Sequence, residues 1–371
     1  MTSIITEKTV QNIIGRRKKE IHKGDCGRIM IAAGSRGMAG AAILAARSAL
    51  RAGSGLVRTA IPAELFPVVQ VGVPEATCIE RRLPIQNLSD FDAICIGPGL
   101  GETKESIDFV KELLISYEKT LIVDADGLNI IAHQNLFDLL RHRGELYPER
   151  TILTPHMGEA KRLLAAPASP GSEPAAPPFD FRSAASAAER ERIADALVRK
   201  THAIIVLKGS GTLVAAEGRR TYTNTTGNPG MATGGSGDVL SGIITSLAGQ
   251  RSQVGTELAA ALTAKTTAVG TDLAAAPVTP ETATAAGDGA SMATATVNGP
   301  ESAPASRTPQ TVEAATCKPR RIGAFEAALA GVYIHGLAGD LAAAEFGEYG
   351  VTAGDLAHYT AYAIKKILSE V

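Results

Sequence analysis

The stretch of sequence that decides the fold reads Thr226-Gly227-Asn228-Pro229-Gly230-Met231-Ala232-Thr233-Gly234-Gly235-Ser236-Gly237-Asp238-Val239-Leu240-Ser241-Gly242. Its first half is crowded with Gly, Asn and Pro, which are typical of a loop. From its second half onward, apolar residues recur at helical spacing, at Val239, Leu240, Ile243, Ile244 and Leu247. The stretch therefore predicts a Gly-rich loop that runs into the N-terminus of a helix.

The predicted turn before this helix offers a site for negative charge. Gly234, Gly235, Ser236 and Gly237 would present backbone N–H groups at a helix N-terminus, an arrangement that binds phosphate and stabilises developing anions. Asp238 would lie in the first helical turn, where a carboxylate can remove a proton from a hydroxyl that attacks phosphorus. An isolated Gly-x-Gly-Asp more often marks an ordinary aspartate on a turn, but the length of this run favours Asp238 as a catalytic base.

Short apolar segments recur along the chain, and each is followed by a Gly-containing turn and a helix-like segment. Their length and β-branched content are typical of strands that are buried on both faces of a parallel sheet. These segments are residues 28–33, 93–96, 120–123 and 203–207. Helices are expected over residues 40–52 and 104–117. The repeated order of strand, turn and helix predicts an α/β fold, layered α/β/α, with helices flanking a mostly parallel central sheet.

The overall composition argues against several classes of protein. The formal net charge is -1, so the chain as a whole has no electrostatic attraction to nucleic acid or to an anionic membrane. The four cysteines form no CxxC pair, which argues against a metal site or a disulfide framework. The N-terminus lacks a basic-then-apolar signal pattern, and no apolar stretch is expected to cross a bilayer. We therefore expect a cytoplasmic location.

Two segments interrupt the pattern of strands and helices. Residues 165–178 are rich in Ala, Pro, Ser and Gly and are expected to form a low-complexity loop. In residues 251–320, 31 of the 70 positions are Ala or Thr, a composition that buries too little apolar surface to offset the entropy of ordering. We expect this insertion to be disordered. A helical pattern resumes at Phe325, so the insertion interrupts a single domain that spans residues 1–371.

Several polar residues after predicted strands have two interpretations each. His156 is either a solvated loop residue or, three residues before Glu159, part of a cleft edge. Glu159 either caps a helix next to Pro155 or orders Mg²⁺ through water, since Mg²⁺ keeps most of its waters and takes few carboxylates. Asp124 and Asp126 lie in an Asp-Ala-Asp-Gly turn that Asx-turn chemistry explains as well as catalysis does.

The common nucleotide-binding loops do not match this sequence. There is no Gly-Lys-Ser/Thr, which excludes a Walker loop, and Gly97-Pro98-Gly99-Leu100-Gly101 lacks the spacing of a dinucleotide fingerprint. Glycines at 97–101 nevertheless allow a ligand to approach the backbone at the carboxyl end of a sheet. Lys208 ends a strand and can pair with a phosphate as a point charge. His335 and Asp340 are expected to pack and cap a helix, and the alternative is that they line the nucleotide site.

The run Asn228–Asp238 resembles the signature of the ADP/ATP-dependent NAD(P)H-hydrate dehydratases, a branch of the ribokinase-like fold. Other segments match the family's motifs in order, and together they cover nearly the whole chain except the two biased segments. They are Lys23–Asp25, Gly34–Ala42, Gly53–Val57, Gly97–Gly101, Asp124–Asn129, Thr154–Glu159, Leu207–Thr212 and His335–Asp340.

The resemblance implies a set of binding residues. Contacts to the hydrated dinucleotide are implied at Ala41, Gly101, His156 and Asp238. Contacts to the adenine nucleotide, ADP or AMP, are implied at Lys208, Gly209, Ser210, Gly211, Thr212 and Gly237. It also implies Mg²⁺, a homotetramer, and a separate NAD(P)HX epimerase as the pathway partner.

The implied activity is ADP- or ATP-dependent dehydration of (S)-NADHX or (S)-NADPHX to NADH or NADPH through a phosphorylated intermediate. Bacterial members of the family are associated with ADP. Two alternatives remain open at this point. One is a ribokinase-like small-molecule kinase, such as a vitamin-precursor hydroxymethyl kinase, that uses the same base. The other is a catalytically inactive nucleotide-binding protein, although the intact Asp238 and its glycines argue against a lost activity.

Overall fold

The computed structural model describes residues 2–85, 87–166, 179, 181, 186–252 and 321–369. They belong to one compact unit, Met1–Thr266 with Pro319–Val371, whereas a second unit, Thr267–Lys318, lies outside the described residues. The predicted loop at 165–178 and the Ala/Thr-rich insertion at 251–320 also fall almost entirely outside them. The expectations of a loop, of disorder and of a single domain therefore stay predictions.

A ten-stranded sheet forms the centre of the described unit, in the order β1-β10-β9-β8-β7-β6-β5-β2-β3-β4. Neighbouring strands are parallel except at β9, which is antiparallel to both β8 and β10. The prediction of a mostly parallel sheet is confirmed. The strands are β1 (Ser3–Ile4), β2 (Arg28–Ala32), β3 (Leu56–Ile61), β4 (Thr77–Glu80), β5 (Ala93–Ile96), β6 (Thr120–Val123), β7 (Thr151–Leu153), β8 (Ile204–Leu207), β9 (Leu213–Ala215) and β10 (Tyr222–Thr223).

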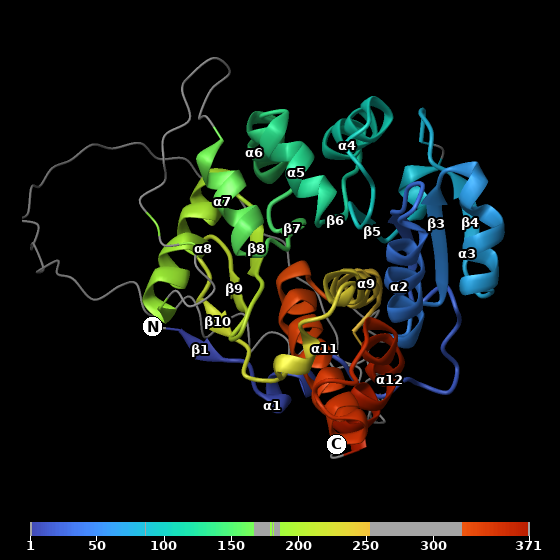
Figure 1. The fold of residues 1–371 in the computed structure, drawn as a ribbon, viewed down its shortest axis with the longest axis vertical. Helices are drawn as coiled ribbons and strands as arrows, with labels where there is room; N and C mark the ends of the chain where they lie inside the picture. The colour runs from blue at the N-terminus through green and yellow to red at the C-terminus, as the bar shows by residue number, and fades with distance from the viewer. Residues whose placement is uncertain are drawn as a thin grey trace, which may run out of the picture. The chain divides into compact units, whose positions relative to one another are not determined.

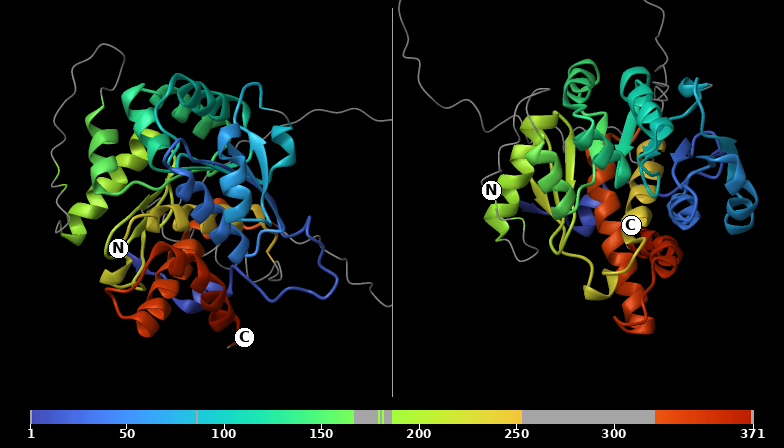
Figure 2. Two further views of the ribbon diagram at one scale, coloured as in Figure 1. Left: turned by 45° about the vertical axis from the view of Figure 1, so that its right-hand side comes forward. Right: turned by 45° about the horizontal axis from the view of Figure 1, so that its top comes forward.

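Helices cover both faces of this sheet (Figures 1 and 2). One face packs against α4 (Lys104–Ser116), α5 (Asp126–His133), α6 (Phe137–Leu146), α7 (Met157–Ala165) and α8 (Ala187–Thr201). The other packs against α1 (Glu7–Gln11), α2 (Ala39–Arg51), α3 (Phe66–Gly72), α9 (Ser236–Gly249), α11 (Ala324–Phe346) and α12 (Ala353–Ser369). Short 3-10 turns are η1 (Ala63–Leu65), η2 (Leu88–Asp90) and η3 (Pro229–Met231). The predicted α/β/α layering is confirmed.

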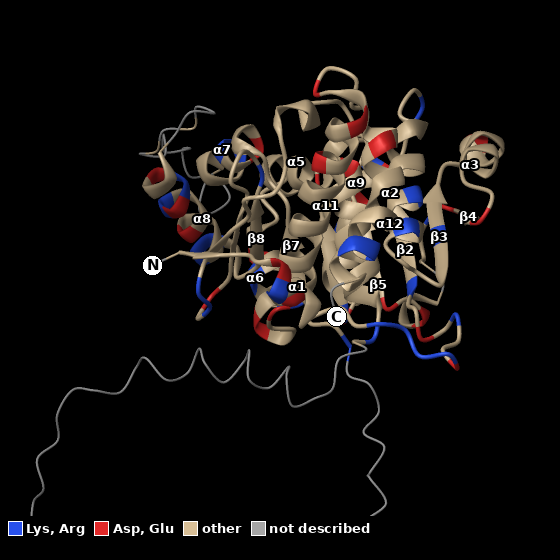
Figure 3. Cartoon of the chain, turned by 90° about the horizontal axis from the view of Figure 1, so that it is seen from below, with Lys and Arg blue, Asp and Glu red and all other residues tan. Residues whose placement is uncertain are grey.

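The central strands β5, β6 and β8 are almost entirely apolar because both of their faces are covered. Along β2, Ile29 and Ile31 enter the core on the α9 side, and Met30 and Ala32 enter the core on the opposite side. This alternation follows from the two-residue period of a strand. Charge is left to the outer helices: α8 carries many charged residues, whereas β7 and β8 carry none (Figure 3).

Helix α9 lies at the centre of its layer, and every residue from Val239 to Gly249 is buried. It packs closely against α2, because a Cβ added at Gly242 would come within 2.2 Å of the Ala45 carbonyl oxygen. Glycine at this position therefore allows the two helices to approach, and the approach fixes where the N-terminus of α9 lies.

Helix α11 corrects one expectation from the sequence. Ala324–Phe346 is long and apolar enough to cross a membrane by length and composition, although the sequence predicted no such stretch. Within its most apolar stretch, 67% is buried inside the protein, and the helix packs against α9 and α12. Burial inside the fold accounts for its apolar composition.

Candidate active site

The candidate site lies where the carboxyl ends of the central parallel strands meet the N-terminus of α9. The turns after β2 and β5 are joined by a hydrogen bond from the Gly34 N–H to the Pro98 carbonyl oxygen, at 2.8 Å. The ends of β7 and β8 are joined in the same way by the Lys208 N–H and the Pro155 carbonyl oxygen, at 2.8 Å. In open α/β sheets, this edge is where ligands bind.

The loop-to-helix transition predicted from the sequence is confirmed. Helix α9 begins at Ser236 after Gly235, whose φ of 92° is in the left-handed region that favours glycine. The Ser236 N–H donates to the Thr233 carbonyl oxygen at 3.3 Å, so this predicted anion-hole donor is engaged within the turn. In the described part of the chain, the N–H groups of Gly237 and Asp238 have no such partner and remain for a ligand.

Asp238 lies in the first turn of α9 and is partly buried. Burial raises the pKa of its carboxyl to about 7, and the negative charges of Asp124 and Asp126 contribute in the same direction. The ammonium of Lys208 opposes them. A carboxylate with this pKa accepts a proton near neutral pH, which is the property that a general base requires.

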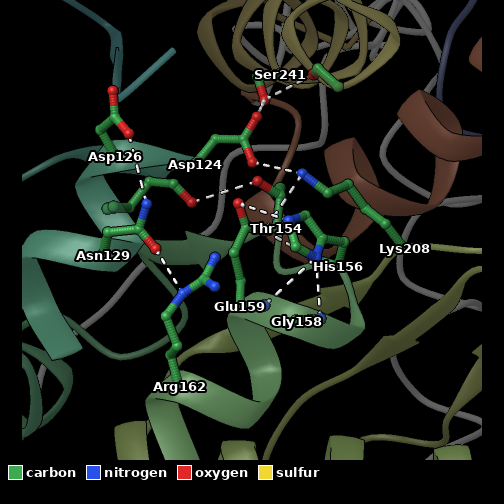
Figure 4. A network of polar contacts seen from close by, with 12 residues as sticks. Asp124, Asp126, Asn129, Thr154, His156, Gly158, Glu159, Arg162, Lys208 and Ser241 are labelled. Atoms are coloured by element: carbon green, nitrogen blue, oxygen red, sulfur yellow. Dashed lines mark hydrogen bonds and ion pairs between the residues drawn. The ribbon is translucent and has the colours of Figure 1, made fainter. Parts of the chain in front are cut away.

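A buried ionic network, drawn in Figure 4, lies against Gly237 in the first turn of α9. Lys208 Nζ donates to Asp124 Oδ1 at 2.7 Å and lies 3.7 Å from Glu159 Oε2. The other Asp124 oxygen, Oδ2, accepts from Ser241 Oγ at 2.6 Å. Burial alone would lower the pKa of Lys208, but the two carboxylates outweigh it and raise the pKa.

This pairing was not predicted from the sequence. There, Lys208 was interpreted as a point charge for phosphate, whereas in the structure the ammonium is already held by carboxylates. The pKa of Asp124 is lowered because Lys208 and hydrogen bonds from Ser241 and Thr154 outweigh its burial. The one usable signal was that Asp124 and Lys208 each directly follow a buried strand.

Asp126 connects a different pair of turns. Its Oδ2 accepts from the Gly101 N–H at 2.8 Å, and its Oδ1 accepts from Asn129 Nδ2 at 3.4 Å. Asn129 Oδ1 in turn accepts from Arg162 Nε at 2.9 Å, which links α5 to α7. In the described residues, neither the Asp124 nor the Asp126 carboxylate bonds to the backbone of its own turn. The Asx-turn interpretation is therefore wrong for both.

His156 and Glu159 form a capping box at the start of α7. His156 Nδ1 accepts from the Gly158 N–H at 2.9 Å, and Glu159 Oε2 accepts from the His156 N–H at 2.8 Å. The capping interpretation of Glu159 is confirmed. Burial lowers the pKa of His156, and with Nδ1 accepting, its Nε2 carries the proton of the neutral ring. The imidazole is 53% exposed, so it remains accessible to a ligand.

The predicted dinucleotide contacts Ala41 and Gly101 lie on adjoining segments. A Cβ added at Gly99 would come within 2.9 Å of the Ala41 Cβ, so the 97–101 turn packs directly on the start of α2. A Cβ added at Gly101 would lie 3.8 Å from Ser35 Oγ in the turn after β2. The binding roles of Ala41, Gly101 and His156 stay predictions.

The six predicted nucleotide contacts are brought together in one cavity of about 730 Å³. They are Lys208, Gly209, Ser210, Gly211, Thr212 and Gly237. His335 also lines the cavity, and burial lowers the pKa of its imidazole to about 4, so the ring is neutral. Its Nε2 lies 3.3 Å from Ser236 Oγ, which places it against the start of α9.

Asp340 has a different role from the helix cap expected from the sequence. It lies within α11, and its carboxylate accepts from the Gly227 N–H and from Asn228 Nδ2, each at 3.0 Å. The capping prediction is wrong for Asp340. The carboxylate instead anchors the beginning of the Gly-rich loop that leads to α9.

The chain has a ribokinase-like α/β fold. A ribokinase-like superfamily protein from Enterococcus faecalis superposes with a TM-score of 0.67 at 21% identity, covering 99% of this chain and 96% of that one. An ADP/ATP-dependent NAD(P)H-hydrate dehydratase from Bacillus subtilis, co-crystallised with ATP and Mg²⁺, has a TM-score of 0.64 at 22% identity and covers 99% of each chain. At this identity the likeness establishes the fold.

Sequence relatives define the family within that class. The family model described as NAD(P)H-hydrate dehydratase matches residues 29–289. The ADP-dependent (S)-NAD(P)H-hydrate dehydratase of Lactococcus lactis is 31% identical over 69% of this chain and 86% of its own length. The bifunctional NAD(P)H-hydrate repair enzyme of Moorella thermoacetica is 37% identical over 70% of this chain, which spans 47% of that relative. The chain belongs to the NAD(P)H-hydrate dehydratase family, and it spans about half the length of the bifunctional relatives.

Proposed function

We propose that the chain catalyses the ADP- or ATP-dependent dehydration of (S)-NADHX and (S)-NADPHX, which returns NADH and NADPH. The observation that carries the proposal is the position of Asp238. A carboxyl whose pKa is raised to about 7 lies at the N-terminus of α9, directly beside the cavity lined by Lys208–Thr212. The names of the relatives in the family supply the substrate class.

In the proposed reaction, the base and the backbone N–H groups of the site have different roles. Asp238 removes the proton from the ring hydroxyl of the hydrate as that oxygen attacks the terminal phosphoryl group of the nucleotide. The N–H groups at the start of α9 stabilise the charge that develops on the phosphoryl oxygens. ADP is thereby converted to AMP, or ATP to ADP, and the hydroxyl becomes a phosphate ester.

The ester then leaves. The lone pair of the ring nitrogen expels phosphate with cleavage of the carbon–oxygen bond, and a proton is lost from the neighbouring ring carbon. The sum is hydrate plus ADP to reduced dinucleotide, AMP, phosphate and one proton. The oxygen of the added water leaves in the phosphate.

Mg²⁺ is part of the proposal as an ion held mainly by the nucleotide. Among the described residues, no three His, Cys, Asp or Glu side chains cluster in a way that would hold a metal by themselves. Glu159 would hold the ion through water, and the ion would neutralise charge on the phosphates.

We also propose a homotetramer in the cytoplasm and an NAD(P)HX epimerase as partner, on the family resemblance alone.

The test supplies enzymatically prepared NADHX or NADPHX with ADP or ATP and follows the near-ultraviolet absorbance of the reduced nicotinamide. We expect the absorbance to return in step with the release of phosphate. A phosphorylated product that accumulates without the return of absorbance would assign the chain to the small-molecule kinases. A chain that binds nucleotide and turns over neither would contradict the proposal.

A further inference from the structure

Asp124 is almost completely buried at the carboxyl end of β6, with 1% of its surface exposed, and each of its oxygens has a separate partner. Oδ1 accepts from Lys208 at the end of β8, and Oδ2 accepts from Ser241 in the second turn of α9. One carboxylate therefore connects two strand ends to the helix that carries the base.

The backbone next to Asp124 is held in an unfavourable conformation. Ala125 has φ 46° and ψ −117°, a combination that side chains with a Cβ rarely adopt. This turn directs Asp124 toward Lys208 and α9, and it directs Asp126 toward the Gly101 N–H. The carboxylates on either side of Ala125 thus reach different parts of the site.

Asp124 and Lys208 lie directly against the first turn of α9. A Cβ added at Gly237 would lie 3.3 Å from Lys208 Nζ and 3.7 Å from Asp124 Oδ2. Their charges act on Asp238 in opposite directions, because Asp124 raises the pKa of Asp238 and Lys208 lowers it. Without its carboxylate partners, the Lys208 ammonium would lower the pKa of Asp238 further and weaken it as a base.

Other groups around Asp238 come from three further elements. Asp126 on α5 raises its pKa, His335 on α11 is neutral, and the Cys95 thiol on β5 is buried and protonated. Two charged side chains of the other packed helices bond elsewhere: Arg47 of α2 donates to the Gly72 carbonyl oxygen, and Asp355 of α12 accepts from Thr352. The Asp124–Lys208 pair therefore places one negative and one positive charge close to the base.

We propose that Asp124 is a positioning residue for the base: it fixes the start of α9 against β6 and β8, and it holds the Lys208 ammonium away from Asp238 so that Asp238 remains a free proton acceptor. The role as an aid to catalysis rests on the proposed function. The electrostatic role does not, because it concerns the free protein.

The deciding experiment is a titration of the Asp238 carboxyl in the free protein, by NMR of protein with isotope-labelled aspartate, assigned with Asp238→Asn. In Asp124→Asn, the like charge is lost and Lys208 loses the closer of its two anionic partners, since Glu159 remains at 3.7 Å. We expect the pKa of Asp238 to fall by about 1 to 2 units. Ser241→Ala is the matched control, because it removes a hydrogen bond to Asp124 and keeps its charge; there the pKa of Asp238 should stay close to its wild-type value.

An unchanged pKa of Asp238 in folded Asp124→Asn would overturn the proposal and leave Asp124 as a structural residue. If that variant does not fold, Lys208→Met is the test. We expect Lys208→Met to raise the pKa of Asp238, and an unchanged pKa of Asp238 in this variant would also overturn the proposal. The pH profile of turnover gives a second readout, in which the acid limb of Asp124→Asn shifts to lower pH. Because the titration needs no substrate, its result would still hold if the proposed activity were disproved.

Discussion

Replacing Asp238 with Asn should remove activity and stabilise the fold, and the two effects have one cause. Burial beside Asp124 raises the pKa of this carboxyl from 3.8 to about 7. In the unfolded chain the carboxyl is ionised well below neutral pH, whereas in the folded protein its ionisation is opposed. Wild-type stability attributable to this group is therefore fully present below about pH 4 and is lost as pH rises to about 7.

The magnitude follows from the size of that shift. About three pKa units at about 1.4 kcal/mol each give a penalty of about 4 kcal/mol above neutral pH. This value is an upper bound, since the Asn amide has a burial cost of its own. Between about pH 6 and about pH 8.5, the folded-state carboxyl completes its ionisation, so about 1 kcal/mol of the difference between Asp238→Asn and wild type should develop there.

Urea unfolding at several pH values measures this difference, with turnover and nucleotide binding measured on the same preparations. We expect Asp238→Asn to have a higher free energy of unfolding than wild type, with a gap that widens with pH. Its turnover should fall on the order of 10² to 10⁴-fold while nucleotide binding survives. Lower stability of the variant than of wild type at about pH 8 would contradict the raised pKa of Asp238. Turnover within a factor of a few of wild type would contradict the role of Asp238 as base.

Three further predictions address the turns around the base. His156→Ala should lose about 1 kcal/mol of stability because it removes the capping hydrogen bond, whereas His156→Asn should keep the cap. Both variants should raise the KM for the hydrate. Equal stability of the two variants would argue against the capping role. Ala125→Gly should stabilise the fold by about 1 kcal/mol in urea unfolding, because it relieves a positive φ at the entropic cost of glycine; a loss of stability would show that the turn is unstrained. Deleting residues 256–316 should leave folding and turnover largely intact, because an antiparallel backbone β-bridge between Arg251 and Arg321 already holds the two ends of the segment together. A chain that no longer folds would show that the insertion is structural.

The elements that the sequence predicts well are those whose burial leaves a simple pattern. Residues 93–96 and 120–123 become β5 and β6 without adjustment, because strands covered on both faces must be continuously apolar. The start of α9 is equally readable, since Gly235 needs a positive φ and the apolar spacing begins directly afterwards. The position of Asp238 in the first turn of α9 follows from this local signal alone.

The rest depends on which strands become neighbours, and local patterns do not contain that information. Asp124 meets Lys208 only because β6, β7 and β8 are adjacent in the sheet. Asp340 reaches the 227–228 loop only because α11 passes beside it, so its role as an anchor was mistaken for a cap. Helix α11 is long and apolar enough to cross a membrane although it is a core helix. The reason is that burial in protein and burial in lipid select the same apolar residues.

The phosphorylated intermediate is tested most directly by following the oxygen atom of the added water. Hydrate prepared with a heavy-oxygen label in its ring hydroxyl is converted with ADP, and the label is then located by mass spectrometry of the phosphate. If Asp238 directs that oxygen onto phosphorus, the released phosphate carries one labelled oxygen for each reduced dinucleotide formed. Unlabelled phosphate, with the label in the solvent water, would contradict a phosphorylated intermediate and the role assigned to Asp238.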